Sequence, residues 1–207
     1  VHIAPKLQAV LRLYQHRGFQ IRSLHADPEF DPLKPHFPHL HTVGADDHVT
    51  EAERCIRTIK DRVRSAYSVL PFKCIPRNML IRLVKNAVFW LNAFISRTAA
   101  SQQHSPRFIM TGKQLDYSKH VRLEFGAYVQ THEKHDNSLQ PRTAGALCLG
   151  PTGDSLGTHW FLHLRTGDIT KRSRWTPSKG ALPMPQEVID RVEQLGRAQA
   201  AAPALAF

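Results

Sequence analysis

Residues 50–70 carry apolar side chains at helical spacing, and Pro71 marks the point where that helix must end. Side chains three and four residues apart lie on one face of a helix, so a single apolar face is predicted. Its members are Ile56, Ile59, Val63, Ala66 and Leu70. Proline lacks the backbone N–H that a helix needs, so we expect the chain to leave helical structure there. A second helix is predicted from Arg77 to about Phe94, and it is apolar almost all round, which is typical of a buried helix.

The first of these helices also carries a carboxylate followed by a row of cations. Residues three or four apart stack above one another, so one stripe of the helix is expected to hold four charged side chains. They are Glu53, Arg57, Lys60 and Arg64, with Arg54 beside them. The whole chain has 28 Lys and Arg against 17 Asp and Glu, a net charge of +11, which favours a polyanion such as nucleic acid as partner. A metal-binding acid beside a phosphate-binding row would suit an enzyme that acts on a nucleic-acid backbone.

Both features have a simpler structural interpretation. Thr50-Glu51-Ala52-Glu53 matches the Ser/Thr-x-x-Glu capping box, in which the Glu53 carboxylate bonds back to the Thr50 amide. By local rules alone, this capping role is favoured over a metal-binding role. Rows of Lys and Arg also form ordinary solvated helix faces. The sequence of this helix therefore leaves both interpretations open.

Upstream, a short strand is predicted to deliver an acid at its C-terminal end. Residues 19–26 have the composition of a strand, and Asp27 follows directly. Two-metal phosphoryl transfer needs carboxylates from separate elements that converge on one point, and Asp27 and Glu53 are of the right type. The simpler interpretation of Asp27 is a turn-forming residue before Pro28.

The surrounding N-terminal sequence predicts little other regular structure. Helical spacing over residues 7–14 stops at Gly18, a reasonable helix terminator. Four prolines between positions 28 and 38 are expected to exclude regular structure, and a second short strand is expected at residues 39–43. A zinc site can be drawn from His36, His39, His41 and His48. The prolines interrupt this segment, so a metal role for the histidines is not favoured.

The character of the sequence changes at Phe125. Residues 96–124 are irregular and polar, which predicts a connector. Short β-like pieces then follow at residues 128–130, 146–149 and 159–164. Gly, Pro and Asn separate them, so a small all-β unit is predicted. A short amphipathic helix is expected at residues 186–195, with a disordered alanine-rich end after Arg197.

Cysteine usage and hydropathy limit the class of protein further. Cys55, Cys74 and Cys148 form no Cys-x-x-Cys pair, so neither a disulfide framework nor a cysteine zinc site is implied. A reducing compartment, nuclear or cytoplasmic, is the natural inference. The most apolar run, residues 79–95, is interrupted by charged side chains, so we expect no membrane partner.

A series of motifs occurs in a fixed order along residues 18–176. The longer ones are Leu24-His25-Ala26-Asp27-x-Glu29-Phe30, Ala52-Glu53-Arg54-x-x-Arg57-Thr58, Ser105-Pro106-Arg107-Phe108-x-x-x-Thr111-Gly112-Lys113 and Phe125-Gly126-Ala127-Tyr128-Val129. Leu149-Gly150-Pro151, Leu164-x-Thr166-Gly167 and Ser173-Arg174 follow them. In this order, the series resembles the integrase of copia-type LTR retrotransposons and the β-rich segment that follows it in the polyprotein.

The resemblance implies an α/β fold in several parts. Residues 1–100 would form a partial RNase H-like integrase core made of short strands and two main helices. Residues 101–124 would be a connector, and residues 125–178 a small β-barrel-like, SH3-like unit. Residues 179–207 would hold the short helix and a disordered tail.

The resemblance also implies a catalytic site. Asp27 would match the second and Glu53 the third of three acids that hold Mg²⁺ or Mn²⁺, with Asp31 as the alternative for the second. The first acid of the family lies on a strand before the opening helix, so we expect it upstream of Val1. The sequence departs from the family pattern near both acids. Asp27-Pro28-Glu29-Phe30 stands where the family usually has Asp-Asn-Gly-Gly-Glu-Phe, and Asp46-Asp47-His48 replaces an Asn-Gly pair.

These implications lead to one expected function and two rivals. Arg54, Arg57, Lys60 and Arg64 would contact DNA, both the ends of the mobile element and its target. The intact protein would be a polynucleotidyl transferase, working as a homo-oligomer, that processes 3′ ends and transfers strands. The given chain, without the first acid, is expected to bind DNA without integrating it. The rivals are a non-catalytic nucleic-acid or chromatin-binding remnant, and a structural piece of a polyprotein whose terminal helix serves assembly.

Overall fold

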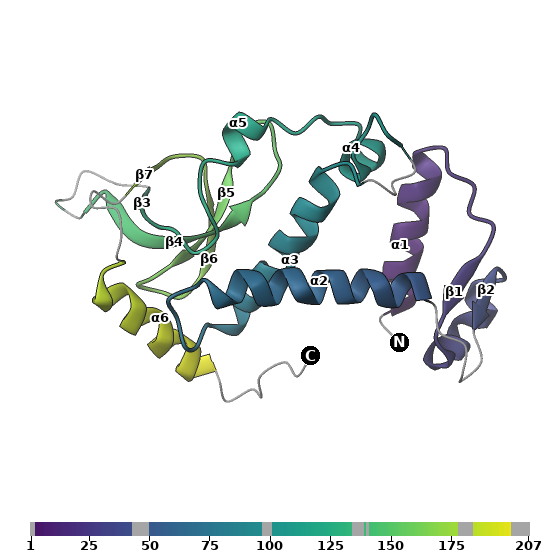
Figure 1. The fold of residues 1–207 in the computed structure, drawn as a ribbon, viewed down its shortest axis with the longest axis horizontal. Helices are drawn as coiled ribbons and strands as arrows, with labels where there is room; N and C mark the ends of the chain where they lie inside the picture. Colours follow the sequence, from purple (N-terminus) through teal and green to yellow (C-terminus); the bar gives the residue numbers. More distant parts are fainter. Residues whose placement is uncertain are drawn as a thin grey trace. The chain divides into compact units, whose positions relative to one another are not determined.

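The chain is a mixture of helices and strands that forms two compact units (Figure 1). The computed structural model describes residues 3–42, 50–96, 101–133, 139, 141–177 and 184–199, with only the backbone for Thr50 and Glu51. Unit 1 comprises residues 1–58 with 92–113, and unit 2 comprises residues 59–91 with 114–207. The four-part division expected from the sequence stays a prediction.

Unit 1 starts with a helix and a pair of short parallel strands. The elements are α1 (Ile3–His16), β1 (Leu24–Ala26), the 3₁₀-helix η1 (Pro28–His36) and β2 (Leu40–Thr42). The predicted helix stop is confirmed, since Gly18 has a left-handed φ of 82°. The strand predicted over residues 19–26 is wrong in its first half, because only residues 24–26 find a partner, in β2. The second predicted strand is confirmed for residues 40–42, and its last residue, Val43, lies outside the described residues.

The proline-rich segment is regular, contrary to expectation. η1 covers residues 28–36 and contains Pro32 and Pro35. Proline has a φ near −65°, which a 3₁₀-helix accepts, and Pro28 sits at the first turn where its missing N–H is not needed. The prolines therefore prevent an α-helix without preventing helical turns.

The two long helices occur where the apolar spacing predicts them. They are α2 (Thr50–Ser68) and α3 (Arg77–Ala93). On the predicted apolar face of α2, Val63 is buried but Ile56 is 50% exposed, so only the C-terminal half of that face is covered. In α3, Met79 and Leu83 are fully buried while Ile81 is 41% exposed. The expectation that this helix is buried is therefore confirmed only in part.

The expected irregular connector contains two short helices. They are α4 (Pro106–Thr111) and α5 (Tyr117–His120). The Ser105 hydroxyl caps α4 by accepting a hydrogen bond from the Phe108 N–H, and Gly112 ends the helix with a left-handed φ of 69°. The Asp116 carboxylate accepts from the Ser118 N–H at the start of α5. Capping signals thus stabilise helices too short to show an apolar period.

Unit 2 is built on a five-stranded antiparallel sheet. The strands are β3 (Tyr128–His132), β4 (Thr143–Pro151), β5 (His159–His163), β6 (Ile169–Arg172) and β7 (Trp175–Pro177). Their order across the sheet is β6-β5-β4-β3-β7, so the last strand returns to pair with the first. The three predicted β pieces correspond to β3, β4 and β5. The short edge strands β6 and β7 were not predicted from the sequence.

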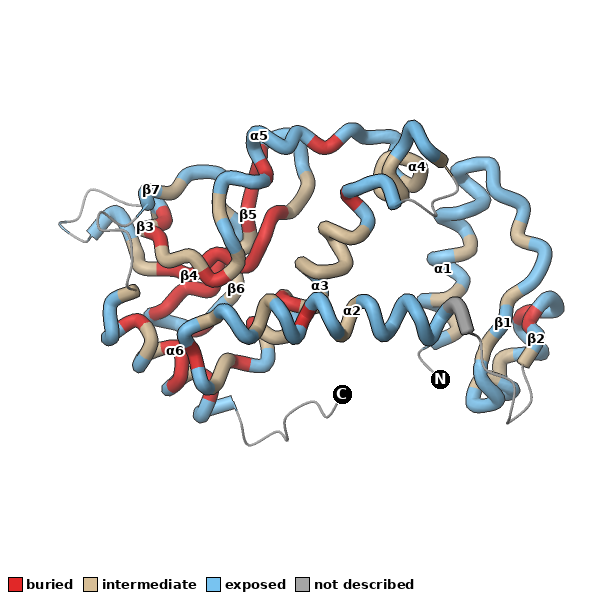
Figure 2. The backbone as a smooth tube through the Cα atoms, in the orientation of Figure 1, coloured by how far each residue is buried: buried red, intermediate tan, exposed pale blue. Residues whose placement is uncertain are grey.

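Both faces of this sheet are buried, as Figure 2 shows for β4 and β5. One face packs into a cluster made of Phe72, Met79, Leu147, Leu149, Leu162, Leu164, Val188 and Val192. The other face forms a second cluster of Val129, Ala146, Cys148 and Phe161. Trp175 of β7 stacks edge-on against His159 of β5 at 4.8 Å, although these strands are not neighbours. The sheet is therefore curled around the second cluster.

The C-terminal helix covers the first of these faces. α6 spans Gln186–Gln199, four residues longer than predicted, and buries Val188 and Val192. Glu193 is also buried, and its carboxylate accepts from the Lys73 N–H at 2.9 Å and from the Arg197 guanidinium at 2.8 Å. The apolar face of α6 is therefore occupied inside unit 2. The alanine-rich end after residue 199 lies outside the described residues.

Gly150→Ala tests how closely α3 approaches the sheet. Gly150 lies in a bulged part of β4 with φ of 92°, and a Cβ there would sit 2.2 Å from Asn86 Oδ1. We expect the substitution to lower the free energy of unfolding by about 2–4 kcal/mol, from backbone strain plus overpacking. The control, Gly18→Ala, has a similar φ of 82° but open space around its Cβ, and should cost about 1 kcal/mol. Urea unfolding followed by circular dichroism measures both, and equal losses would contradict the close approach.

Candidate nucleic-acid interface

The N-terminal half of α2 is exposed on every side. All residues from 52 to 58 are exposed, and this run is almost two turns of helix long. Figure 2 shows α2 as largely exposed over its length. None of the described residues covers this helix surface, so it is available to a partner.

The exposed half of α2 carries cations that have no counter-ion among the described residues. Arg54 and Arg57 are exposed, and neither has a carboxylate within ion-pair distance in the part of the chain that the structure describes. Lys60 is half-buried one turn further on. Arg64 lies 3.2 Å from the Asp61 carboxylate, but both side chains are more than half exposed, so the pair holds its cation weakly. The predicted row is therefore present on one continuous helix, with its positive charge largely uncompensated.

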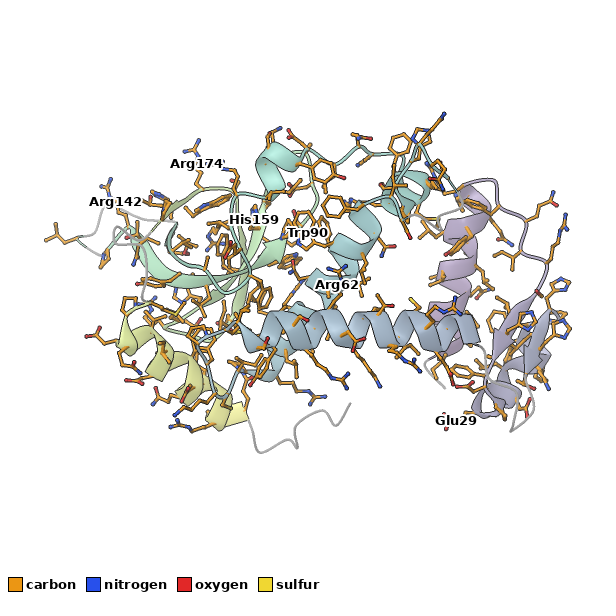
Figure 3. The ribbon with its side chains drawn as sticks, in the orientation of Figure 1. Glu29, Arg62, Trp90, Arg142, His159 and Arg174 are labelled. Atoms are coloured by element: carbon orange, nitrogen blue, oxygen red, sulfur yellow. The ribbon has the colours of Figure 1, made fainter. Side chains whose placement is uncertain are left out.

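Sequence reasoning missed one cation on the same helix. Arg62 is exposed on α2 (Figure 3), about 200° round the helix axis from Lys60. It lies off the predicted stripe, which is why spacing did not select it. The positive charge of α2 thus extends beyond one face.

Glu53 lies at the predicted place, in the first turn of α2, and is exposed. The capping interpretation involves the side chain of Thr50, which lies outside the described residues. Both interpretations of Glu53 stay predictions.

Asp27 occupies the position that a strand-end acid needs. It follows β1 directly and is exposed, and its side chain makes no cap hydrogen bond to η1. The backbone carbonyl of Asp27, by contrast, accepts from the Phe30 N–H at 3.0 Å. The turn at Pro28 is therefore formed by the main chain, and the carboxylate is left for another role.

Asp31, the alternative acid, is engaged in local structure. Its Oδ1 accepts from the Thr42 hydroxyl at 2.7 Å and lies 2.7 Å from the Lys34 ammonium. The hydrogen bond from Lys34, aided by the one from Thr42, holds the pKa of the Asp31 carboxyl below its ordinary value. Asp31 therefore links η1 to the end of β2, which makes Asp27 the better candidate for a ligand.

No metal centre is assembled among the described residues. They contain no group of three or more His, Cys, Asp and Glu side chains able to hold an ion. Asp27 and Glu53 alone do not meet the needs of a two-metal site, so the residues described do not fit Mg²⁺ or Mn²⁺ chemistry by themselves. Of the drawn histidine group, His48 lies outside the described residues.

The most buried histidine serves the fold. His159 lies inside unit 2 (Figure 3), with its ring nitrogens 2.9 Å from the Gly157 carbonyl and 3.2 Å from the His120 carbonyl. Burial lowers the pKa of His159 below its ordinary value, despite both carbonyl contacts. The ring therefore links the turn at Gly157 to the end of α5.

The described helices and the comparisons add two further findings. None of the helices in the described ranges is both long enough and apolar enough to cross a membrane. No family model, curated protein or solved structure matches the chain. Its function has to be argued from its own residues.

Asp31→Asn should loosen the β1–β2 pair, whereas Asp27→Asn should not. The first change removes a carboxylate that bonds Thr42 and Lys34, and the second removes one without such partners. We expect faster hydrogen exchange of the β2 amides in Asp31→Asn alone. Because the pKa of Asp31 is lowered in the fold, its contribution is complete above the unfolded pKa of about 3.9 and is lost as the pH falls through the folded value. Equal exchange rates in both variants would show that the Asp31 contacts contribute nothing.

Proposed function

We propose that the protein binds DNA through the cations of α2 and is part of a copia-type integrase. The observation that carries the proposal is the exposed first half of α2, with its arginines unpaired among the described residues. The net charge of +11 supports a polyanionic partner over a neutral one. The motif order along the sequence supports the family.

The chemistry of α2 suits a phosphate backbone. Arginine offers planar forked donors that match phosphate oxygens, and lysine offers a compact charge. Cations spaced along one stripe repeat every turn, about 5.4 Å, so several phosphates can be contacted by one helix. Contacts of this kind fix position and affinity but carry no base sequence. Sequence-independent binding is what an integrase requires of its target.

The architecture supports the proposed relationship in both units. In unit 1, two short strands precede the helix that carries Glu53, which is the order expected of a partial RNase H-like core. In unit 2, the strand order β6-β5-β4-β3-β7 is that of a four-strand meander whose fifth strand returns to the first. An ion pair between Glu133 and Arg172 links the ends of β3 and β6 and favours closure. We infer that this unit is an SH3-like barrel.

Catalysis is less well supported than DNA binding. Asp27 and Glu53 are both exposed and belong to unit 1, but a third acid is not grouped with them among the described residues. This favours the non-catalytic form of the proposal, in which the chain binds DNA without cutting or joining it. Strand transfer, a need for Mg²⁺ or Mn²⁺, and homo-oligomer assembly are proposed for the intact protein.

Removing the α2 cations should weaken DNA binding and reduce its dependence on salt. The variant replaces four side chains with Gln: Arg54, Arg57, Lys60 and Arg64. Each lost phosphate contact lowers the slope of log K against log salt by about 0.9, so the full variant should lose roughly 3 to 4 units of slope. Fluorescence anisotropy with a duplex of arbitrary sequence, titrated at several salt concentrations, gives both the affinity and the slope.

A charge-matched variant distinguishes DNA contacts made by α2 from attraction by the net charge of the chain. It replaces four exposed cations outside α2 with Gln: Lys6, Arg12, Arg77 and Arg165. Both variants have the same net charge, so a purely global attraction would weaken both equally. If the control loses as much slope as the α2 variant, the proposed interface is wrong.

The purified chain should bind DNA but transfer no strand in Mg²⁺ or Mn²⁺. The reason is that Asp27 and Glu53 supply two acids where the two-metal reaction needs a group of three. A strand-transfer assay with an oligonucleotide that mimics an element end measures this directly. Clear metal-dependent product that disappears in Glu53→Gln, while binding persists, would refute the non-catalytic form of the proposal.

A further inference from the structure

Trp160 of β5 brings together two cations from different parts of unit 2. The Arg82 guanidinium carbon of α3 lies 3.5 Å from the centre of the Trp160 ring, and the Lys171 ammonium of β6 lies 4.4 Å from it. Lys171 is also the residue directly opposite Trp160 across the β5–β6 ladder. Both cations are therefore within about 8 Å of each other, because they contact the same ring.

Neither cation has an anionic partner in the part of the chain that the structure describes. Among the described residues, no carboxylate lies within ion-pair distance of Arg82 or Lys171, and no backbone or side-chain oxygen accepts a hydrogen bond from either. Arg82 is half-buried, and that burial lowers the pKa of its guanidinium. Each cation is attracted by the indole ring, but the two like charges repel each other, and an anion bound to both would relieve that repulsion.

The indole itself is well anchored. Trp160 is half-buried against the cluster that contains Met79, Leu147 and Leu162, so its ring is held by the core of unit 2. Arg82 is held in turn by α3, whose Asn86, one turn later, lies directly beneath Gly150 of β4. The site is thus preorganised by packing, which lowers the entropy cost of binding.

We propose that Arg82 and Lys171, positioned by Trp160, form a second phosphate-binding site for the DNA backbone, made of residues of unit 2 that lie outside α2. The ligand is a phosphodiester oxygen pair, taken by the arginine fork and the lysine ammonium together. Trp160 is a positioning residue, since the cations already occupy its ring. The inference rests on the proposed function only in taking DNA as the partner.

A phosphodiester fits better than a carboxylate or a membrane surface. Each phosphate offers two anionic oxygens, which one forked donor and one mobile ammonium can share. An isolated two-cation site also suits a regularly repeating polyanion, because a second contact elsewhere on the same strand adds to the affinity. A lipid surface would call for exposed apolar side chains beside the cations, whereas Trp160 and Ile169, which share the sheet face of Lys171, are half-buried against the core of unit 2.

The test measures the salt slope of DNA binding by the full chain in three variants. Arg82→Gln and Lys171→Gln should each reduce the slope by about 0.9, as expected for one lost phosphate contact. Trp160→Leu keeps both charges, yet it should reduce the slope as well, because the cations lose their common support. Trp160→Phe retains an aromatic face and should restore most of the slope. An unchanged slope in Trp160→Leu would overturn the positioning role, since mere loss of packing does not alter the number of phosphate contacts.

Lys85→Gln is the matched control, because Lys85 is an exposed cation on the same helix. It should leave the slope within error of the parent chain, and a loss equal to that of Arg82→Gln would overturn the site. Circular dichroism and urea unfolding identify any variant that fails to fold. Lys171 is exposed, so Lys171→Gln is expected to fold, and its salt slope then decides whether the site exists.

Competition identifies the ligand chemistry. Duplex DNA should displace the labelled duplex, whereas polyglutamate and vesicles of anionic phospholipid at equal charge should not do so through this site. If either competes equally in the parent chain and loses that ability in Arg82→Gln, the phosphodiester assignment is wrong. If the Arg82 and Lys171 variants lose slope and the α2 variant does not, the α2 interface is wrong and the Arg82–Lys171 site is supported. If only the α2 variant loses slope, the Arg82–Lys171 site is wrong and the α2 interface is supported.

Discussion

Burial of one sheet face beneath α3 and α6 is the interaction on which unit 2 depends. Leu147, Leu149 and Leu162 contribute from the strands, and Met79 and Val192 from the helices. Each such side chain contributes about 1.5–3 kcal/mol when fully buried, whereas an exposed ion pair contributes about 0–1 kcal/mol. The apolar layer therefore decides where the helices lie, and the polar contacts adjust to it. The buried Glu193 illustrates this, since it accepts from the Lys73 N–H only because α6 is already docked.

The same layer gives the polar surface of unit 2 its geometry. Once α3 is packed on the sheet, Arg82 can reach only a small region, and Trp160 lies within it. The glycine at position 150 permits that close approach, because a side chain there would meet Asn86. An arrangement of surface cations that would cost energy on a flexible loop is thus imposed by apolar packing elsewhere. The placement of these surface cations is therefore a consequence of core packing.

Sequence reasoning succeeded where one local period dominates and failed where partners decide. The periods of α2, α3 and α6 were readable because an apolar stripe is repeated over several turns. β6 and β7 were missed because each is an edge strand of three or four residues, too short for an alternation to emerge. η1 was missed because proline was taken to exclude every helix rather than the α-helix alone. Exposure of Ile56 could not be foreseen, since periodicity says which residues share a face and not whether anything covers it.

The candidate site also has one part that local sequence predicts and one part that depends on tertiary contacts. A row of cations on one helix needs no tertiary information, because the helix alone orders Arg57, Lys60 and Arg64. A metal centre needs carboxylates from separate elements to converge within a few ångströms, and no spacing in a sequence encodes that convergence. Asp27 and Asp31 make the point, since the sequence left them as alternatives. The contacts from Thr42 and Lys34 to Asp31 distinguish this structural acid from Asp27, whose carboxylate makes no cap hydrogen bond. DNA binding is consequently the better-founded part of the proposed function, and the proposed catalysis would depend on a geometry that helices cannot supply alone.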